Sequence, residues 1–229
     1  MVAANRDEQL DRPASAPRLW SDRSPALFAP EDLRAGGTWM GLNAAGLFVG
    51  ITNRFAGGAD PGAISRERRS RGLLVLDGLA APSARDAFAR FESMPGDLHN
   101  PFHLVLADRD AAYVVWSDGW VLHREILAPG LHVVTERSRG AAPSGREDSL
   151  ADLDVPLEEL RALLAVHREN PFDSTCVHAD DHNYGTRSAS FIVFDEGGPT
   201  RFEATAGPSC INPWEDLSGP MRAALGSGP

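Results

Sequence analysis

The sequence predicts an α+β fold of stacked, mainly antiparallel sheets with helices outside them. Strand patterns occur in two groups that helical segments interrupt, and short turns rich in glycine, proline and aspartate join neighbouring strands. Apolar side chains fall on both faces of the first hairpin, which indicates a sheet covered on both sides. With 229 residues and 42% hydrophobic composition, we expect one domain over residues 1–217 and a disordered tail over 218–229.

The first third of the chain predicts an opening strand, an extended segment and a hairpin. Residues 1–4 have the pattern of the end of a strand, and the polar run Asn5-Arg6-Asp7-Glu8 follows at once. Four prolines between residues 11 and 32 disfavour long regular structure there. The apolar runs 38–42 and 47–51 are separated by a short turn that ends in glycine, which predicts the hairpin.

Helices are expected next, followed by a meander of strands. Ser83, three residues before Asp86, resembles a helix-capping box, and apolar residues then recur at helical spacing. Residues 137–149 are rich in glycine, proline, serine and charge, and predict a mobile loop. The predicted helices are residues 65–79, 83–91 and 157–167. The predicted strands are residues 102–107, 112–116, 120–126, 131–135, 188–194 and 201–205.

The composition excludes several function classes. All 22 basic residues are arginine, whereas pyridoxal enzymes, Schiff-base aldolases, Walker phosphate loops and protein kinases each need a lysine amine. The net charge is −10 and the arginines are scattered among carboxylates. We therefore expect neither nucleic acid nor an anionic membrane surface as a partner.

The sequence contains no apolar run long enough for membrane insertion and no pattern of a secretory signal. Its two cysteines, Cys176 and Cys210, do not suggest a disulfide framework. We therefore expect a cytoplasmic protein with reduced thiols. The oligomeric state stays open.

The run Asn5-Arg6-Asp7-Glu8 is the first candidate for chemistry. It places an amide, a fixed cation and two carboxylates in four positions, and carboxylates beside a guanidinium stay ionised and can orient an amine or thiol in a pocket. The alternative is a turn with a surface ion pair.

This run and several others resemble one known family, the NRDE family, also called the transport and Golgi organisation protein 2 family. The resemblance extends from Val2 to about Phe202. The matching segments are residues 2–8 and 11–14, Gly36-Gly37-Thr38-Trp39-Met40-Gly41 with Thr52-Asn53, Ser70-Arg71-Gly72-Leu73-Leu74, Asn100-Pro101-Phe102-His103-Leu104, and Tyr184-Gly185-Thr186-Arg187-Ser188.

The resemblance implies an αββα sandwich similar to the N-terminal nucleophile hydrolases, particularly their cysteine-dependent amidase branch. In that branch a cysteine after the initiator methionine becomes the new terminus, and its α-amine acts as the general base for its thiol. Here Val2 follows Met1, so we expect that the first strand of the fold and its cysteine are missing from this sequence.

The resemblance also implies a set of site residues. Arg6 and Asp7 would lie near the nucleophile, and Asn53, Asn100 and Arg187 would contact the substrate or its oxyanion. Asn100 has the alternative of forming a turn before a proline, and Arg187 that of a structural ion pair. Where related amidases favour an asparagine, this chain has Thr135-Glu136.

Two further features are weighed against ordinary structural roles. Cys176 and His178 lie near Asp180, Asp181 and His182. We favour a buried cysteine with turn-forming neighbours over a zinc site there, and we expect no metal and no cofactor. The tryptophans are expected mainly in the core.

Two functions are compatible with this sequence. The first is an amide or ester hydrolase acting on a small-molecule substrate. The alternative is a non-enzymatic binding or trafficking protein for a hydrophobic metabolite, either haem or an acyl or lipid compound.

Overall fold

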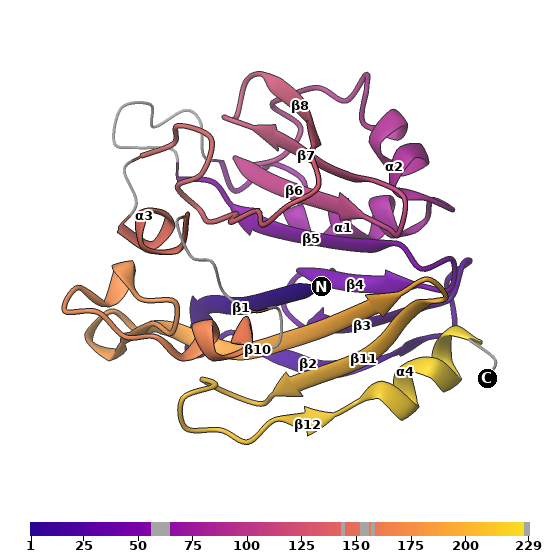
Figure 1. The fold of residues 1–229 in the computed structure, drawn as a ribbon. Helices are drawn as coiled ribbons and strands as arrows, with labels where there is room; N and C mark the ends of the chain where they lie inside the picture. Colours follow the sequence, from indigo (N-terminus) through magenta and orange to yellow (C-terminus); the bar gives the residue numbers. More distant parts are fainter. Residues whose placement is uncertain (56–64, 143–144, 152–155, 157–158, 227–229) are drawn as a thin grey trace.

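Two antiparallel sheets pack face to face in the computed structural model, which describes residues 1–55, 65–142, 145–151, 156 and 159–226 (Figure 1). One sheet has seven strands in the order β2-β3-β4-β5-β6-β7-β8, and the other has the order β1-β10-β11-β12 with β9 paired to β10. The strands are β1 (Val2–Gln9), β2 (Ala14–Trp20), β3 (Leu27–Asp32), β4 (Met40–Asn43), β5 (Phe48–Asn53), β6 (Phe102–Ala107), β7 (Ala112–Ser117), β8 (Leu122–Leu127), β9 (His178–Ala179), β10 (Tyr184–Asp195), β11 (Gly198–Thr205) and β12 (Glu215–Asp216).

Short helices and helical turns surround the sheets. Helices α1 and α2 cover the outer face of the seven-stranded sheet, and α4 packs near β11, β2 and β3 (Figure 1). The helices are α1 (Arg71–Leu79), α2 (Ala84–Arg90), α3 (Gly145–Ala151) and α4 (Ser218–Leu225), and the 3-10 turns are η3 (Ala162–Ala165), η4 (Pro171–Asp173) and η5 (Asp180–His182).

The core has two parts, one on each face of the seven-stranded sheet. On the outer face, Leu74 and Leu79 of α1 pack on Leu104 of β6 and its neighbours. Between the sheets, Phe28 and Phe202 meet edge to face with their ring centroids 5.4 Å apart. Both core parts exclude water from fully buried apolar side chains, and this burial is the main driving force for the sandwich.

Several sequence predictions are confirmed. The hairpin is β4 with β5, and Ser83 caps α2 by accepting a hydrogen bond from the backbone N–H of Asp86 (3.1 Å). Three strands of the meander are β6, β7 and β8. The closing pair is β10 with β11. The α+β class and the sandwich of two sheets are therefore as predicted.

The proline-rich segment is not an irregular excursion, because it forms β2 and β3. Pro17 lies where the β2–β3 register shifts, between Ser15 and Arg18. Pro30 lies beyond Leu27 and Phe28, the residues of β3 that pair with β4. These two prolines, which lie inside β2 and β3, thus fall where the ladder does not need their missing N–H groups.

Residues 131–135 do not form the predicted fourth strand, and residues 159–167 do not form the predicted third helix. The first segment leaves the sheet beside β8, and the carbonyl oxygen of Thr135 accepts a hydrogen bond from Thr52 (3.3 Å). In the second segment residues 160–167 form no α-helix and only the 3-10 turn η3, since carbonyl groups here bind partners elsewhere, such as Leu164, which accepts from Asn5 (2.8 Å). Residues 157–158 of this predicted helix lie outside the described residues.

Three helical predictions need correction. Helix α1 begins at Arg71 rather than at the predicted residue 65, and residues 56–64 ahead of it, where a loop was expected, lie outside the described range. Helix α3 occupies part of the expected loop 137–149. The prediction of a disordered tail is wrong for residues 218–225, because Met221 and Leu225 of α4 are buried in the core between the sheets.

Candidate active site

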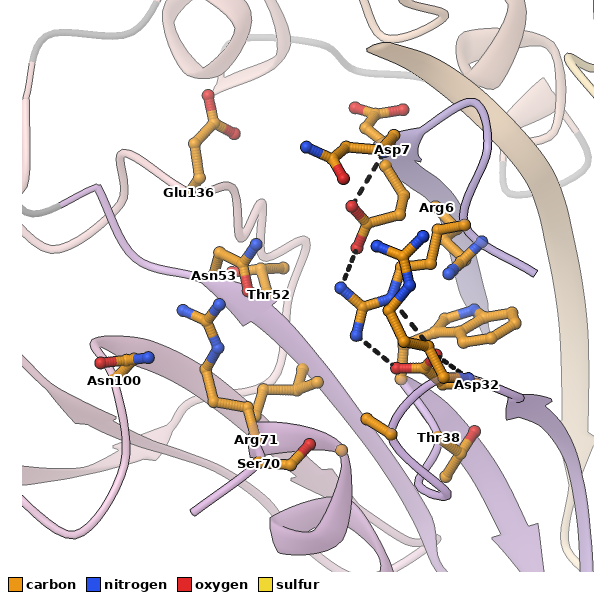
Figure 2. A pocket seen from close by; sticks show the side chains of 18 of the residues that line it. Arg6, Asp7, Asp32, Thr38, Thr52, Asn53, Ser70, Arg71, Asn100 and Glu136 are labelled. Carbon is orange, nitrogen blue, oxygen red and sulfur yellow. Dashed lines mark hydrogen bonds and ion pairs between the residues drawn. The ribbon is translucent and has the colours of Figure 1, made fainter. Parts of the chain in front are cut away.

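A cleft of about 860 Å³ lies where one end of each sheet meets the start of α1 (Figure 2). The end of β1 supplies residues 6–9, the end of β5 supplies Thr52 and Asn53, and α1 supplies Arg71. A β-bulge between Arg6 and Asp7 breaks the alternation of β1, so that consecutive side chains face the cleft.

Arginines dominate the charge of this cleft. The described lining holds eight arginines, which are residues 6, 12, 34, 66, 68, 69, 71 and 146, against four carboxylates, which are residues 7, 8, 32 and 136. The whole chain, by contrast, has a net charge of −10. Low-dielectric walls lined with one sign of charge concentrate ligands of the opposite sign.

Arg6 and Arg71 face the cleft from opposite walls (Figure 2). The guanidinium carbon of Arg6 lies 4.2 Å from the centroid of the Trp39 ring. Arg71 donates from Nη1 to the carbonyl oxygen of Pro101 (2.8 Å). Within the described part of the chain, neither side chain forms a direct ion pair, although Glu8 and Asp32 attract Arg6 and Glu8 attracts Arg71 at longer range. Burial lowers the pKa of both, that of Arg71 to about 10, so each retains its proton and its charge near neutral pH.

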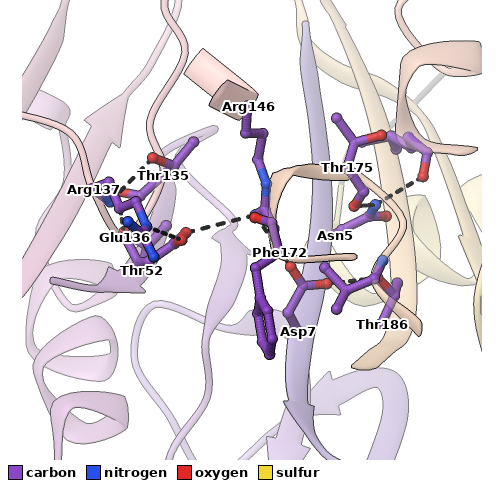
Figure 3. Close-up of polar contacts among 12 residues, drawn as sticks. Asn5, Asp7, Thr52, Thr135, Glu136, Arg137, Arg146, Phe172, Thr175 and Thr186 are labelled. Atoms are coloured by element: carbon purple, nitrogen blue, oxygen red, sulfur yellow. Dashed lines mark hydrogen bonds and ion pairs between the residues drawn. The ribbon is translucent and has the colours of Figure 1, made fainter. Parts of the chain in front are cut away.

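Asp7 is a largely buried carboxylate of the site, with 13% of its side chain exposed (Figure 3). Its Oδ1 accepts a hydrogen bond from the Thr186 hydroxyl (2.6 Å), and its Oδ2 lies 3.2 Å from Nη1 of Arg146. Arg146 also lies 3.6 Å from Glu136, so it bridges the two walls. Burial raises the pKa of Asp7, and the attraction of Arg146 opposes that rise.

A second buried acidic group of the cleft, Asp32, is held ionised. Arg12 forms a bidentate pair with Asp32 through Nε (3.2 Å) and Nη2 (2.5 Å), and it also lies 3.4 Å from Glu8. Although burial disfavours the charge of Asp32, the Arg12 pair and nearby backbone N–H groups lower the pKa of its carboxyl group.

The wall that carries Arg71 depends on a close contact between two glycines. A Cβ atom on Gly37 would lie 2.5 Å from the carbonyl carbon of Gly72, too close for any other residue type without movement. The N–H of Thr38 donates to the Gly72 carbonyl oxygen (3.2 Å) across this contact. The start of α1 is thereby fixed against the loop that carries Thr38 and Trp39.

Four of the five site residues predicted from the sequence lie in the cleft, and the fifth does not. Arg6, Asp7, Asn53 and Asn100 all line the cleft. The amide of Asn100, however, both donates to and accepts from the backbone of Ser65 (2.8 Å each), so it braces that loop. Arg187 lies on β10 and is not among the described lining residues, although its charge helps to lower the pKa of Arg6.

Sequence reasoning gave no role to Arg71, Arg12 or Arg146, which are central to the charge of the site. Arg12 and Arg71 stand inside two of the segments that resemble the family, and this position could have marked them as site residues. Arg146 lies in a region with no distinguishing pattern, and only the packing of α3 brings it to Asp7.

No cysteine occurs among the described residues that line the cleft. Cys176 and Cys210 lie close to each other elsewhere. The Met1 amine lies at the other end of β1, and Met1 lines a second cavity of about 740 Å³ with Asp108 and Arg109. Burial lowers the pKa of this amine.

The model of a known family, described as Transport and Golgi organisation 2, matches residues 1–144 of the sequence. The chain belongs to this family. The Transport and Golgi organization protein 2 homolog of Bos taurus is 29% identical, with 90% of each chain covered. The human homolog is 32% identical over 49% of this chain and 40% of its own.

Solved structures with the same fold include two enzymes. Penicillin V acylase from Agrobacterium tumefaciens is similar with a TM-score of 0.50 and 15% identity, covering 94% of this chain and 82% of the acylase. A variant of conjugated bile acid hydrolase from Clostridium perfringens has a TM-score of 0.53 and 11% identity, covering 95% and 88%. The family member described here therefore has the fold of N-terminal nucleophile hydrolases, as its sequence predicted.

None of the helices described in this family member combines the length and the apolar character that crossing a bilayer requires.

Proposed function

We propose that this chain is an amide or ester hydrolase of the N-terminal nucleophile type, and that its substrate is a small molecule with an anionic group. The fold supports the first part, because an acylase and a hydrolase share it. The observation that carries the proposal is the excess of arginine in a cleft of a strongly acidic chain.

Arg6 and Arg71 are the proposed anion ligands. Each is a guanidinium in the cleft wall that forms no direct ion pair within the described residues, although Glu8 attracts both at longer range, so a carboxylate or phosphate on the substrate supplies the direct partner. Asn53 offers an uncharged amide donor beside them for an oxyanion. The ion pairs of Arg146 with Asp7 and Glu136 join the two walls of the cleft through side chains.

The nucleophile in this proposal is a cysteine at the start of a further strand ahead of Val2, as the family resemblance implies, and that strand would run back along β1 to bring the cysteine to the cleft. Its thiolate attacks the substrate carbonyl while its α-amine accepts the thiol proton. The same proton then passes to the leaving amine or alcohol. Water hydrolyses the resulting thioester, which restores the thiol and releases the acid.

The test uses protein expressed from the native gene with every in-frame codon ahead of Met1. Intact mass and terminal sequencing identify the mature terminus. Hydrolysis is then measured on paired amides that differ only in a carboxylate. Turnover that is lost when the terminal cysteine is replaced by alanine supports the hydrolase, and a mature terminus at Val2 with no turnover contradicts it.

The anion site is tested separately with Arg71→Met and with Arg90→Met as the matched control on α2. A lost charge-assisted contact of about 1.5–3 kcal/mol corresponds to roughly a 10- to 150-fold loss. We expect that loss in kcat/KM for the carboxylate substrate alone and no change in Arg90→Met. An equal loss for both substrates would refute the anion role.

Binding of haem or an acyl metabolite stays a prediction that the lining does not specifically favour. Trp39 is covered by Arg6, which leaves less flat apolar surface for such a ligand. Haem absorbance or extractable lipid in the purified protein would support this second function.

A further inference from the structure

Four metal-binding side chains meet at a point outside the cleft. His167 follows η3, Cys176 lies two residues before β9, His178 begins β9, and Cys210 lies in the turn after β11. One nitrogen of each histidine and both sulfur atoms lie within 4.8 Å of one another. Three separate segments of the chain thus present two thiols and two imidazoles to a shared centre.

Three separations, those among Cys176, His178 and Cys210, match the edges of a tetrahedral zinc site, and a ring nitrogen of His167 lies within 4.8 Å of these three ligand atoms. Zinc–sulfur bonds of about 2.3 Å and zinc–nitrogen bonds of about 2.0–2.1 Å give edges of roughly 3.8 Å between two sulfurs and roughly 3.5 Å between sulfur and nitrogen. The sulfur atoms of Cys176 and Cys210 lie 3.5 Å apart. Nε2 of His178 lies 3.6 Å from the first sulfur and 3.3 Å from the second.

We propose that His167, Cys176, His178 and Cys210 bind one Zn²⁺ ion as a closed structural site. All four positions of a tetrahedron are filled by the protein, which is typical of structural rather than catalytic zinc. The metal takes the place of the two thiol protons, so binding releases two H⁺ to solvent and leaves two thiolates on the ion.

A disulfide is the competing use of the same two cysteines. A disulfide requires about 2.05 Å between the sulfurs, well below the 3.5 Å observed, and both thiols are free in the structure. A disulfide also gives no reason for two imidazoles beside the sulfurs, whereas a metal ion uses all four groups.

The surrounding backbone holds the ligands in position. The N–H of Cys176 donates to the carbonyl oxygen of Val166 (3.1 Å), next to His167. The hydroxyl of Ser209, which precedes Cys210, donates to the carbonyl oxygen of Leu164 (3.0 Å). The three segments therefore contact one another through main-chain groups as well as through the ligands.

This cluster also supports the candidate active site. Asn5 donates from Nδ2 to the carbonyl oxygens of Leu164 (2.8 Å) and Thr175 (2.6 Å), and Thr175 precedes Cys176 (Figure 3). Asn5 is two residues before Asp7 on β1. An ion at the cluster would fix the two carbonyl groups that anchor this strand.

The ligand set differs from the grouping that the sequence suggested. Asp180, Asp181 and His182 form η5 and do not belong to the cluster. His167 and Cys210 replace them, although Cys210 stands 32 positions after His178. No short motif marks a ligand set with this spacing.

The first test measures metal content and coordination in the unaltered chain. Protein purified without chelator and desalted is expected to contain about one zinc per chain. Exchange with Co²⁺ is expected to give the visible bands and sulfur-to-cobalt charge-transfer absorption of a tetrahedral Cys₂His₂ site. Adding Zn²⁺ at about 1,000 times its Kd to the stripped protein should raise Tm on the order of 10 °C.

The second test compares Cys210→Ser and His167→Asn with His182→Asn, a nearby histidine outside the cluster. The first two variants are expected to lose the metal on desalting and the cobalt spectrum, while the control keeps both. If a variant fails to fold, the cobalt spectrum of the unaltered chain still decides. Stripped protein that binds no Zn²⁺ or Co²⁺, or a mass 2 Da below that of the dithiol under non-reducing conditions, would overturn the proposal.

Discussion

The hydroxyl of Thr186 is the most informative single group to remove. It donates to Oδ1 of Asp7 (2.6 Å) and accepts from the N–H of Val177 (2.8 Å), and its residue is only 1% exposed. Thr186→Val keeps the shape and deletes both hydrogen bonds. Losing the bond to a charged acceptor costs about 1.5–3 kcal/mol, and a buried N–H without a partner costs about 1–3 kcal/mol.

We therefore expect Thr186→Val to lower the free energy of unfolding by about 3–5 kcal/mol. For a chain of this size that corresponds to a fall in Tm of roughly 6–20 °C. Thr186→Ser is the control, because it keeps the hydroxyl and loses one buried methyl group, at a cost of about 1 kcal/mol. Urea unfolding followed by tryptophan fluorescence measures both.

The loss of unfolding free energy in Thr186→Val, called the deficit below, should also depend on pH. The Thr186 hydroxyl lowers the pKa of Asp7, so its removal raises further a folded-state pKa that burial already places above the ordinary 3.8. When the folded-state pKa of a carboxyl group is raised, the group's contribution to the free energy of unfolding is lost as pH rises through that pKa. The deficit of Thr186→Val should be smallest below pH 3.8 and grow toward neutral pH. Equal stability of the valine and serine variants at pH 7 would refute this account.

Two further predictions concern His103 and α4. The ring of His103 is fully buried, and burial lowers its pKa to about 4, so the free energy of unfolding should fall as pH drops from 6.5 toward 4, by on the order of 3 kcal/mol. His103→Gln should remove that part of the pH dependence in urea titrations, and an unchanged slope would argue against it. Met221→Ala should cost about 2–5 kcal/mol because the side chain is fully buried, while the exposed neighbour Arg222→Ala should cost under about 1 kcal/mol. Equal thermal stability of these two variants would show that α4 does not contribute to the core.

Sequence patterns predicted the elements that are stabilised by contacts between residues close together in the chain. The cap of α2 depends on Ser83 and Asp86, three residues apart, and the β4–β5 hairpin on a short turn, so both could be predicted from sequence. Residues 159–167 carried a helical pattern as well. Asn5 and Ser209, distant in sequence, bind the carbonyl oxygen of Leu164 and favour an open turn instead.

The residues of the candidate site also fall into those that a short sequence run contains and those that only the fold brings together. Arg6 and Asp7 were predicted because one short run contains both. The bridge from Asp7 to Arg146 joins residues 139 positions apart, and no periodicity reports such a contact. The prolines of β2 and β3 misled the prediction because their effect depends on where neighbouring strands stop pairing, which only the register shows.

The glycine contact gives the cleft one rigid side and one adjustable side. Two backbones in van der Waals contact at Gly37 and Gly72 cannot slide independently, so Arg71 and Trp39 move as a single unit. The opposite side is joined to β1 through the side chain of Arg146, whose rotamers can change without breaking a backbone ladder. Substrates of different size would therefore be accommodated by displacement of α3, while the distance between the anion ligand Arg71 and the ring of Trp39 stays constant.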